Sequence, residues 1–577
     1  MTVFSVWAPD HESVDLQLDD RVVPMAARDG GWWQVDVPDA APGTRYRFAL
    51  DGGPGRPDPR SPWQPEGIDG PSATVDHSAF AWTDQSWRSR SWPSVVLYEC
   101  HIGTFTEAGT FDAAIGRLDH LVALGVNAVE VLPVAEGSGD RGWGYDGVDL
   151  WAPHHAYGGP DGFKRFVDAC HGRGIAVVLD VVYNHLGPAG NYLAEFGPYF
   201  TDRYQTPWGS AVNVDGAGSD EVRRFIIDNA RMWMVDYHVD GLRLDAVHAI
   251  IDLSALPILE ELACAVDDLA GHLGRPLWLI AESDRNDPRL VAAPEAGGFG
   301  LTATWDDEWH HALHSALTDD RSGYYEDFGP LSLVARAMEH GYVYGRHWSP
   351  HRNRHHGRPL GDLPRSRLVA FTQNHDQVGN RADGARLAAL TSPGRLRVAA
   401  ALLLTGPFVP MLWMGEEWGA STPWQYFTDH RDPELGAAVT EGRTHEFGYF
   451  GWDPDQVPDP QDRVTFDRSI LRWDELDDPQ HAALLVWHRD LLELRRGIED
   501  LTASAVADTT CRADDAAGTL QMTRRGVLVS VNIGPDSARF KLPAGSRLLL
   551  GSDQGIEIGD GWVRVPPDAV AITASPR

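Results

Sequence analysis

The fold can be inferred from the run IAVVLDVVYNH, residues 175–185. Its apolar residues are consecutive rather than alternating, which is typical of a parallel strand covered on both faces. An amphipathic segment over 219–237 follows and predicts a helix. The same order, an apolar run and then an amphipathic segment, recurs between residues 94 and 496. This repetition predicts βαβ units built around a parallel sheet.

Eight strands and seven helices are predicted in this region. The strands are 94–99, 126–134, 175–183, 239–244, 276–281, 301–305, 367–372 and 408–413, and the helices are 111–125, 161–173, 219–237, 252–272, 307–318, 393–405 and 481–496. A doubly wound open sheet is the alternative, but eight strands favour a closed (β/α)₈ TIM barrel. Long insertions at 184–218 and 319–365 interrupt the pattern, and such loops are usually functional.

Short β-like runs flank the predicted barrel on both sides. Residues 1–92 contain alternating or aromatic runs separated by Gly, Pro and Asp, and we expect an N-terminal β-sandwich. Residues 503–577 return to the same kind of pattern and predict a small C-terminal β domain. The chain is therefore predicted to be an α/β protein of three domains, with the barrel over 93–502.

Composition excludes several classes of protein. The 577 residues carry a net charge of −34, which argues against a nucleic-acid or anionic-membrane partner. Most of the 22 Trp residues are expected in the core, but such a supply of flat rings also suits stacking on sugars or bases, and the negative charge disfavours bases. Four Cys without paired spacing predict neither a disulfide framework nor a zinc site. No secretory signal is visible at the N-terminus, so we expect a cytoplasmic protein. No dense loop of oxygen ligands stands out, so we expect no metal, and we expect no cofactor. The polar stretch HRNRHHGRP, 351–359, is interpreted as a mobile solvated loop.

Polar side chains gather where the predicted strands end. They are Asp180, Asn184 and His185 after the third strand, Arg243 and Asp245 on the fourth, Glu282 after the fifth, and His375 and Asp376 after the seventh. Barrel enzymes carry their chemistry at this end, and convergent carboxylates without a metal cluster suit glycoside hydrolysis. Arg243, two residues before Asp245 on the same strand face, would hold Asp245 ionised as a nucleophile. Glu282 follows the apolar run WLIA, so desolvation would raise its pKa as a general acid requires.

Four of these segments carry a resemblance to a known family. DVVYNH (180–185), GLRLDAVH (241–248), AES (281–283) and NHD (374–376) resemble, in order, the four signature regions of the α-amylase family, glycoside hydrolase family 13. The resemblance implies Asp245 as nucleophile, Glu282 as general acid/base and Asp376 as the carboxylate that stabilises the transition state. It further implies substrate contacts from His185, Arg243, His248 and His375, a sugar platform at Tyr145 with Asp146 beside it in GWGYDG, and support from Asp180 and Asn184.

Longer strings narrow the resemblance. TQNHDQVGNRADGARL (372–387) and PMLWMGEEWGASTPWQYFTDH (410–430) are similar to the branch of the family that releases trehalose from the end of maltooligosyl trehalose. This implies maltooligosyl trehalose and α-glucan oligosaccharides as ligands, and action after a maltooligosyl trehalose synthase. Our candidates for binding the leaving trehalose are Trp208, Trp305, Asp306 and Asp307.

Three points stay open on sequence alone. A glucan branching enzyme would use the same carboxylates with a sugar acceptor in place of water. A catalytically silent glucan-binding protein is a further alternative, although the intact carboxylates Asp245, Glu282 and Asp376 count against it. Glu416 and Glu417 follow the eighth strand and would either face the cleft or join a buried network.

Overall fold

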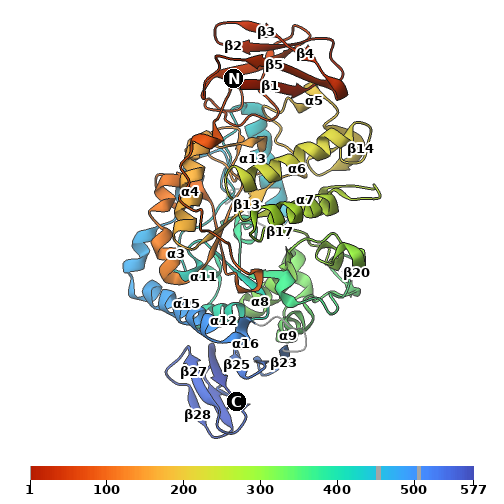
Figure 1. The fold of residues 1–577 in the computed structure, drawn as a ribbon. Helices are drawn as coiled ribbons and strands as arrows, with labels where there is room; N and C mark the ends of the chain where they lie inside the picture. The colour runs from red at the N-terminus through yellow and green to blue at the C-terminus, as the bar shows by residue number, and fades with distance from the viewer. Residues whose placement is uncertain (1, 450–456, 503–508, 577) are drawn as a thin grey trace.

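A closed barrel of eight parallel strands forms the centre of the computed structural model, which describes residues 2–449, 457–502 and 509–576 (Figure 1). Neighbouring strands pair in the order β10–β13–β16–β17–β18–β21–β22–β9. The predicted barrel is confirmed, and each predicted strand run contains or overlaps one of its strands. These are β9 (Leu97–Cys100), β10 (Ala128–Val131), β13 (Ala176–Val181), β16 (Gly241–Leu244), β17 (Trp278–Ala281), β18 (Ala303–Trp305), β21 (Leu368–Phe371) and β22 (Val409–Trp413).

Amphipathic helices surround the barrel. They include α4 (Gly159–Gly172), α6 (Ser219–Val235), α7 (Ile258–Leu273), α8 (Asp307–Thr318), α12 (Pro393–Thr405) and α15 (Pro479–Gly497). Two sequence predictions were wrong in detail. The helix expected over 111–125 is split into α2 (Phe111–Ile115) and α3 (Leu118–Leu124), because Gly116 ends the first segment. The helix expected from residue 252 begins only at Ile258, because Pro257 holds the residue before it out of the helical region.

Both long insertions contain regular structure. Residues 184–218 form α5 (Leu193–Phe196) and a hairpin of β14 (Phe200–Thr206) and β15 (Gly209–Val212). Residues 319–365 form α9 (Leu331–His340) and a hairpin of β19 (His347–Ser349) and β20 (Arg354–His356). The stretch 351–359 is therefore not a solvated loop throughout, because His356 ends β20 and is buried. The helices α13 (Pro433–Tyr449) and α14 (Arg463–Ser469) lie in a segment where no element was predicted.

Two β regions cap the barrel at opposite ends of the molecule (Figure 1). At the N-terminus, β1 (Thr2–Trp7), β5 (Trp32–Val37) and β4 (Ala26–Ala27) form one sheet, and β3 (Val22–Pro24), β2 (Val14–Leu18), β6 (Arg45–Leu50), β7 (Gly55–Arg56) and β8 (Ser72–Ala73) form another. Phe4, Leu16 and Phe48 are buried among them. At the C-terminus, the sheets comprise β23 (Thr509–Asp514), β24 (Thr519–Arg524), β25 (Val527–Asn532), β30 (Ala569–Ala574) and β27 (Arg547–Gly551), and β26 (Ala538–Lys541), β29 (Trp562–Val565) and β28 (Glu557–Gly559).

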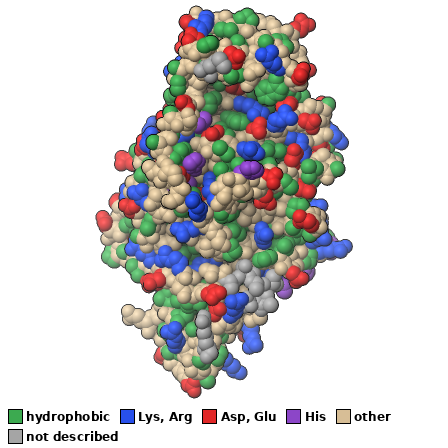
Figure 2. Space-filling view, in the orientation of Figure 1, with side chains coloured by type: hydrophobic (Ala, Val, Ile, Leu, Met, Phe, Trp, Pro, Cys, Tyr) green, Lys and Arg blue, Asp and Glu red, His purple; other side chains and the backbone are tan. Residues whose placement is uncertain are grey.

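Charged side chains of both signs are mixed on one face of the molecule. On the side drawn in Figure 2, acidic and basic side chains are interspersed and the described residues form no broad basic area. Among the described residues, no helix is both long and apolar enough to cross a membrane.

Candidate active site

A single buried guanidinium organises the carboxyl ends of the barrel strands. Arg243 on β16 is fully buried, and its Nη1 donates to both carboxylate oxygens of Asp180 at 2.9 and 2.8 Å and to Oδ1 of Asp245 at 2.8 Å. The guanidinium lies 4.2 Å from the ring centroid of Trp305, a cation–π contact. Two carboxylates from neighbouring strands are thereby fixed against one cation. Burial raises the pKa of Asp180 to about 6 despite the opposing charge of Arg243.

Asp245 stands at the end of β16 with both oxygens engaged. Oδ1 accepts from Arg243, and Oδ2 accepts a hydrogen bond from Nδ2 of Asn184 at 2.6 Å. The next residue, Ala246, has φ of +38°, a conformation that is strained for a residue with a Cβ. This turn aims the Ala246 N–H at Oε2 of Glu282, 2.5 Å away. The backbone N–H of the residue that follows Asp245 is therefore hydrogen-bonded to the carboxyl group of Glu282. The side chain of Asp245 is 12% exposed.

Glu282, immediately after β17, has the opposite electrostatic setting. Its Oε2 lies 3.8 Å from Arg243 Nη2, a full ångström farther than the Asp245 contact with the same guanidinium. Burial, opposed by the charge of Arg243 and assisted by the carboxylates of Asp245, Asp307 and Asp376, raises the pKa of Glu282 to about 8. A carboxyl group with that pKa is mostly protonated at neutral pH. The shift has the direction expected from the apolar strand that precedes it.

Tyr145 and His375 form the floor beside Asp180. The Tyr145 hydroxyl donates to Asp180 Oδ2 at 2.6 Å and lies 2.8 Å from His375 Nε2, and the two rings stack at 5.2 Å. The loop that carries Tyr145 depends on Gly144, whose φ is +99° and where a Cβ would lie 2.3 Å from the carbonyl oxygen of Pro133. Only glycine lets this loop approach the strand end so closely.

Glu99, which the sequence analysis did not single out, orients His375. It lies on β9, is 1% exposed, and its Oε1 is 2.5 Å from His375 Nδ1. Burial lowers the pKa of His375, but the charges of Glu99 and Asp376 and the hydrogen bond with Glu99 outweigh it and raise the pKa to about 8. Asp376 itself is open to solvent, with 42% of its side chain exposed. Glu99 lies near the end of the first predicted strand. The rule applied to the other strands, that polar residues at a strand end mark the site, could therefore have found it.

His185 and Trp208 flank the other side of Asp245. His185 Nδ1 is 2.5 Å from Asn184 Oδ1, and its Nε2 is 3.0 Å from the carbonyl oxygen of Tyr145. Trp208, between β14 and β15, stacks on the His185 ring at 4.4 Å and stays 48% exposed. The first insertion thus places a flat apolar ring at the edge of the carboxylate cluster, as a sugar-stacking side chain requires.

Two predicted substrate contacts lie more peripherally. Asp146 has 42% of its side chain exposed, and its Oδ2 lies 3.9 Å from His430 Nε2. His248 lies in a short 3₁₀ turn, Val247–Ala249, beyond Asp245. Burial lowers the pKa of His248, and its Nδ1 has no hydrogen-bond partner among the described residues.

The structure corrects two of the candidates for binding the leaving sugar. Trp305 is 2% exposed and lies beneath Arg243, and Asp306 is 1% exposed and accepts from the Trp309 N–H as the N-cap of α8. Both side chains are buried, so neither has an exposed surface that a sugar could contact. Asp307, one residue farther, is partly exposed beside Glu282 and accepts a hydrogen bond from Gln377 at 3.4 Å.

Glu416 and Glu417 take the buried-network alternative. Glu417 is fully buried, accepts from the Tyr98 hydroxyl at 3.2 Å and lies 2.7 Å from His120 Nε2. Glu416 accepts from the Thr372 hydroxyl and from the Trp413 N–H, and burial raises its pKa to about 7. These two carboxyl groups support the strand ends from behind.

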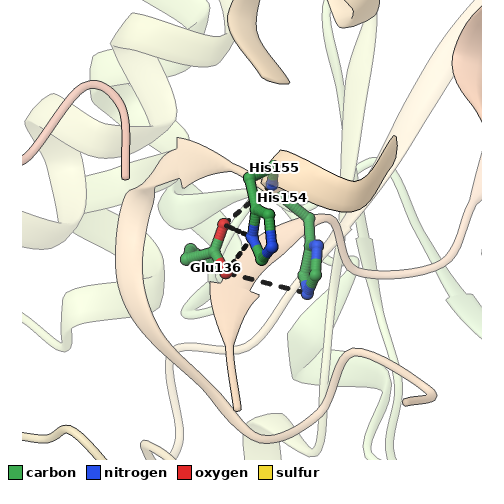
Figure 3. A group of neighbouring side chains, drawn as sticks. All are labelled: Glu136, His154 and His155. Carbon is green, nitrogen blue, oxygen red and sulfur yellow. Dashed lines mark hydrogen bonds and ion pairs between the residues drawn. The ribbon is translucent and has the colours of Figure 1, made fainter. Parts of the chain in front are cut away.

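Glu136, His154 and His155 form a cluster of possible metal ligands away from these carboxylates, with the ligand atoms within 4.8 Å of one another (Figure 3). Protein groups already engage most of the ring nitrogens. His155 Nδ1 is 2.8 Å from Glu136 Oε1, His155 Nε2 is 3.1 Å from Asp140 Oδ1, and the Ala156 N–H donates to His154 Nδ1. The geometry is explained without an ion, so the absence of a metal stays our prediction.

Comparison with known proteins identifies the relatives of this chain. Residues 80–206 match the family model described as the α-amylase catalytic domain, and residues 1–64 match carbohydrate-binding module 48, the isoamylase N-terminal domain. A malto-oligosyltrehalose trehalohydrolase from Arthrobacter ramosus is 52% identical over 92% of this chain and 93% of its own length, and one from a Rhizobium species is 47% identical over 99% and 97%. The chain belongs to the malto-oligosyltrehalose trehalohydrolase family.

Other comparisons agree with this family. The crystal structure of a putative α-amylase from Salmonella typhimurium superposes with a TM-score of 0.92, at 38% identity, and covers 99% of this chain and 97% of its own. A Paenibacillus barengoltzii pullulanase superposes with a TM-score of 0.74 at 17% identity, which shows the shared fold alone. A glucan branching enzyme from Vibrio parahaemolyticus is 32% identical but matches only 55% of this chain. The trehalohydrolase family, rather than the branching enzymes, thus matches the chain along nearly its whole length.

Proposed function

We propose that this protein is a retaining glycoside hydrolase that cleaves the α-1,4-glucosidic bond next to the terminal trehalose of maltooligosyl trehalose. The observation that carries the proposal is the contrast between Asp245 and Glu282. Asp245 pairs with Arg243 at 2.8 Å, whereas burial raises the pKa of Glu282 to about 8. An ionised carboxylate beside a protonated one is the pair that glycoside hydrolysis with retention needs.

The reaction proceeds in two displacements. The Asp245 carboxylate attacks the anomeric carbon, the C–O bond to trehalose breaks, and the Glu282 proton passes to the leaving oxygen. A water molecule then attacks the same carbon, gives its proton to Glu282 and displaces Asp245. The oligosaccharide is released with the α-configuration, and both carboxyl groups return to their initial protonation states.

The neighbouring side chains serve the sugar under attack. Tyr145 offers its ring as a platform, and His185 and His375 line the same strand ends with rings that protein hydrogen bonds hold in place. Asp376, with 42% of its side chain exposed, is available to accept hydrogen bonds from sugar hydroxyls as positive charge develops at the ring. Trp208 stacks at the rim.

The wider setting of the reaction is also part of the proposal. The substrate is supplied by an enzyme that converts the reducing end of a maltooligosaccharide into a trehalose unit, a maltooligosyl trehalose synthase. The chain acts in the cytoplasm as three domains, 1–92, 93–502 and 503–577. The relatives' name supports the substrate, and the two β regions that flank the barrel support the domain division.

One incubation series tests the proposal. The enzyme is given maltooligosyl trehalose, a maltooligosaccharide or amylose, and products are separated by chromatography and NMR. Free trehalose with an α-anomeric new reducing end is expected from the first substrate. New α-1,6 branches on amylose would identify a branching enzyme instead, and binding without turnover would identify a silent glucan-binding protein. Asp245→Ala should lose several orders of magnitude in kcat while keeping the wild-type far-UV circular dichroism.

A further inference from the structure

The segment that connects the N-terminal β region to the barrel, residues 82–91, is held against the barrel by side chains. This segment, called the linker below, forms neither helix nor strand. The Thr83 N–H and hydroxyl donate to the two carboxylate oxygens of Asp168 on α4, at 2.8 and 2.7 Å. Near the other end of the linker, Arg90 Nη2 donates to the carbonyl oxygen of Gly174 at 2.7 Å. The position of the linker therefore depends on a small set of polar contacts with α4 and its surroundings.

One imidazole at the centre of this contact bridges two carboxylates. His171, in the last turn of α4, has a fully buried side chain. Its Nδ1 lies 2.7 Å from Oδ2 of Asp84 in the linker, and its Nε2 lies 2.9 Å from Oδ2 of Asp240, which directly precedes β16. A neutral imidazole carries one N–H, so only the protonated ring donates to both carboxylates at once. The linker and the barrel are thus joined through an imidazolium ion.

Asp240 is held as a carboxylate by donors on both oxygens. Its Oδ1 accepts from Trp87 Nε1 and from Arg275 Nη1, each at 2.7 Å, and its Oδ2 also accepts from the Val177 N–H at 2.9 Å. Burial acts to raise the pKa of Asp240, but the hydrogen bond and charge of His171 and the charge of Arg275 outweigh it and lower this pKa. The proton shared with His171 therefore belongs to the imidazole.

Asp84 is fixed from a second side by His238. Its Oδ2 lies 2.8 Å from His238 Nδ1, and although burial acts to raise the pKa of Asp84, the hydrogen bonds with His171 and His238 lower it. Two indole rings of the linker cover the same imidazoles. Trp82 stacks on His238 with ring centroids 3.8 Å apart, and Trp87 stacks on His171 at 4.5 Å. An aromatic face favours a cationic ring over a neutral one, so this packing also stabilises the protonated form.

The charges around His171 decide the direction of its titration. The titratable and charged groups that face it are Asp84 from the linker, Asp240 before β16 and Arg275 before β17, with His238 beyond Asp84 and with Asp236 and Lys164 beyond His238. Burial lowers the pKa of His171, but the hydrogen bonds and charges of Asp240 and Asp84 outweigh it and raise this pKa. The ring therefore keeps its proton above pH 6.5, where a free histidine is half deprotonated. Once the proton leaves, a ring lone pair faces a carboxylate.

We propose that His171 is a pH-sensitive latch, in which the protonated ring fastens the linker to the barrel and loss of the proton to solvent at alkaline pH releases the linker. The attraction is complete below about pH 6.5 and is lost as the pH rises through the pKa of His171 in the folded protein. Asp240 precedes its strand, whereas Asp245 follows the same strand, so the latch and the catalytic carboxylates lie at opposite ends of β16. The inference therefore does not depend on the proposed function.

Limited trypsin digestion of the full chain tests the latch, because Arg88 and Arg90 in the linker are exposed. Cleavage after these residues is followed by mass spectrometry, and each variant is compared with the wild type at the same pH so that the response of trypsin to pH cancels. At pH 6 we expect the linker of His171→Gln to be cleaved about 10- to 150-fold faster, the cost of losing a hydrogen bond between charged groups. This ratio should fall steadily toward 1 between pH 7 and 10.

Thr83→Ala is the matched control, because it removes a linker contact with α4 that has no imidazole. Its cleavage ratio to the wild type should be the same at every pH. A ratio for His171→Gln that is equally constant from pH 6 to 10 would overturn the latch and leave His171 as a structural contact. His238→Asn tests the second imidazole, since Asn accepts the φ of +58° at this position. If only His238→Asn abolished the pH dependence, the assignment to His171 would be wrong.

A second variant keeps the inference open to refutation if His171→Gln does not show the far-UV circular dichroism of the wild type. Asp84→Asn removes one of the two carboxylates that hold the proton on His171. The pKa of His171 should fall in this variant, so its linker should become accessible to trypsin at a lower pH than in the wild type. An unmoved pH profile would contradict the latch.

Discussion

The sharpest prediction concerns the alkaline limb of the pH–rate profile. Burial and the neighbouring carboxylates raise the pKa of Glu282 to about 8, and the proposed mechanism uses its protonated form. At pH 7 about nine-tenths of the molecules carry this proton, and above pH 8 the fraction falls about tenfold per unit. kcat/KM for maltotriosyl trehalose should therefore be nearly level from pH 6 to 7 and should fall about 50-fold between pH 8 and 10.

Glu282→Gln tests the origin of that limb. The variant cannot donate a proton, so turnover of maltotriosyl trehalose should fall by about 10²- to 10⁴-fold, the usual contribution of general acid catalysis. α-Maltosyl fluoride needs no proton to leave, so the first burst of fluoride release should be largely spared, whereas the second displacement, which uses Glu282 as base, should stay slow. The remaining activity should also lose its dependence on pH around 8.

His375 and Glu416 are among the other groups whose pKa lies near this range, and they serve to challenge this reasoning. The pKa of His375 is raised to about 8, so an alkaline limb that persists unchanged in Glu282→Gln would belong to His375 and would refute the assignment. The pKa of Glu416 is raised to about 7, but it lies in the network behind the strand ends. Glu416→Gln is therefore the control and should keep the wild-type limb.

Three further predictions follow from the same contacts. Asn184→Asp replaces the donor 2.6 Å from Asp245 with a like charge, so kcat should fall by about 100-fold or more with unchanged thermal melting; a loss under 3-fold would contradict the placement. Glu99→Gln removes the charge that keeps the pKa of His375 high, so that pKa should fall. The raised pKa contributes about 2 kcal/mol to the free energy of unfolding below pH 6.5, and this contribution is lost as the pH rises through 8. The variant should therefore show a decrease in Tm that is larger at pH 6 than at pH 9. Dialysis against EDTA should change neither activity nor Tm, because protein groups already engage the ring nitrogens of His155; a loss restored by one divalent metal would disprove this.

The barrel and most of the carboxylate cluster could be predicted because they obey local rules. Consecutive apolar residues marked the buried strands, and polar residues directly after them marked the ends where chemistry sits. Glu99 is the last residue of the predicted strand 94–99 and lies within β9, whereas the search was for polar residues that follow a strand, so it was missed. Asp306 was misplaced although it heads the sequence DDEW, whose acidic start is the signal of a helix N-cap.

The hairpin β19–β20 marks where sequence reasoning had to stop. HRNRHHGRP has no apolar period, and its polar residues resemble any solvated loop. The turn is held by contacts of His351 with Asp327 and of Arg352 with Asp284, which lie 24 and 68 residues earlier in the chain, so no local pattern carries the information. The polar residues at the strand ends follow a local rule and could be placed from the sequence. The position of this hairpin is decided instead by contacts between segments that are distant in the chain, and those contacts exist only in the folded protein.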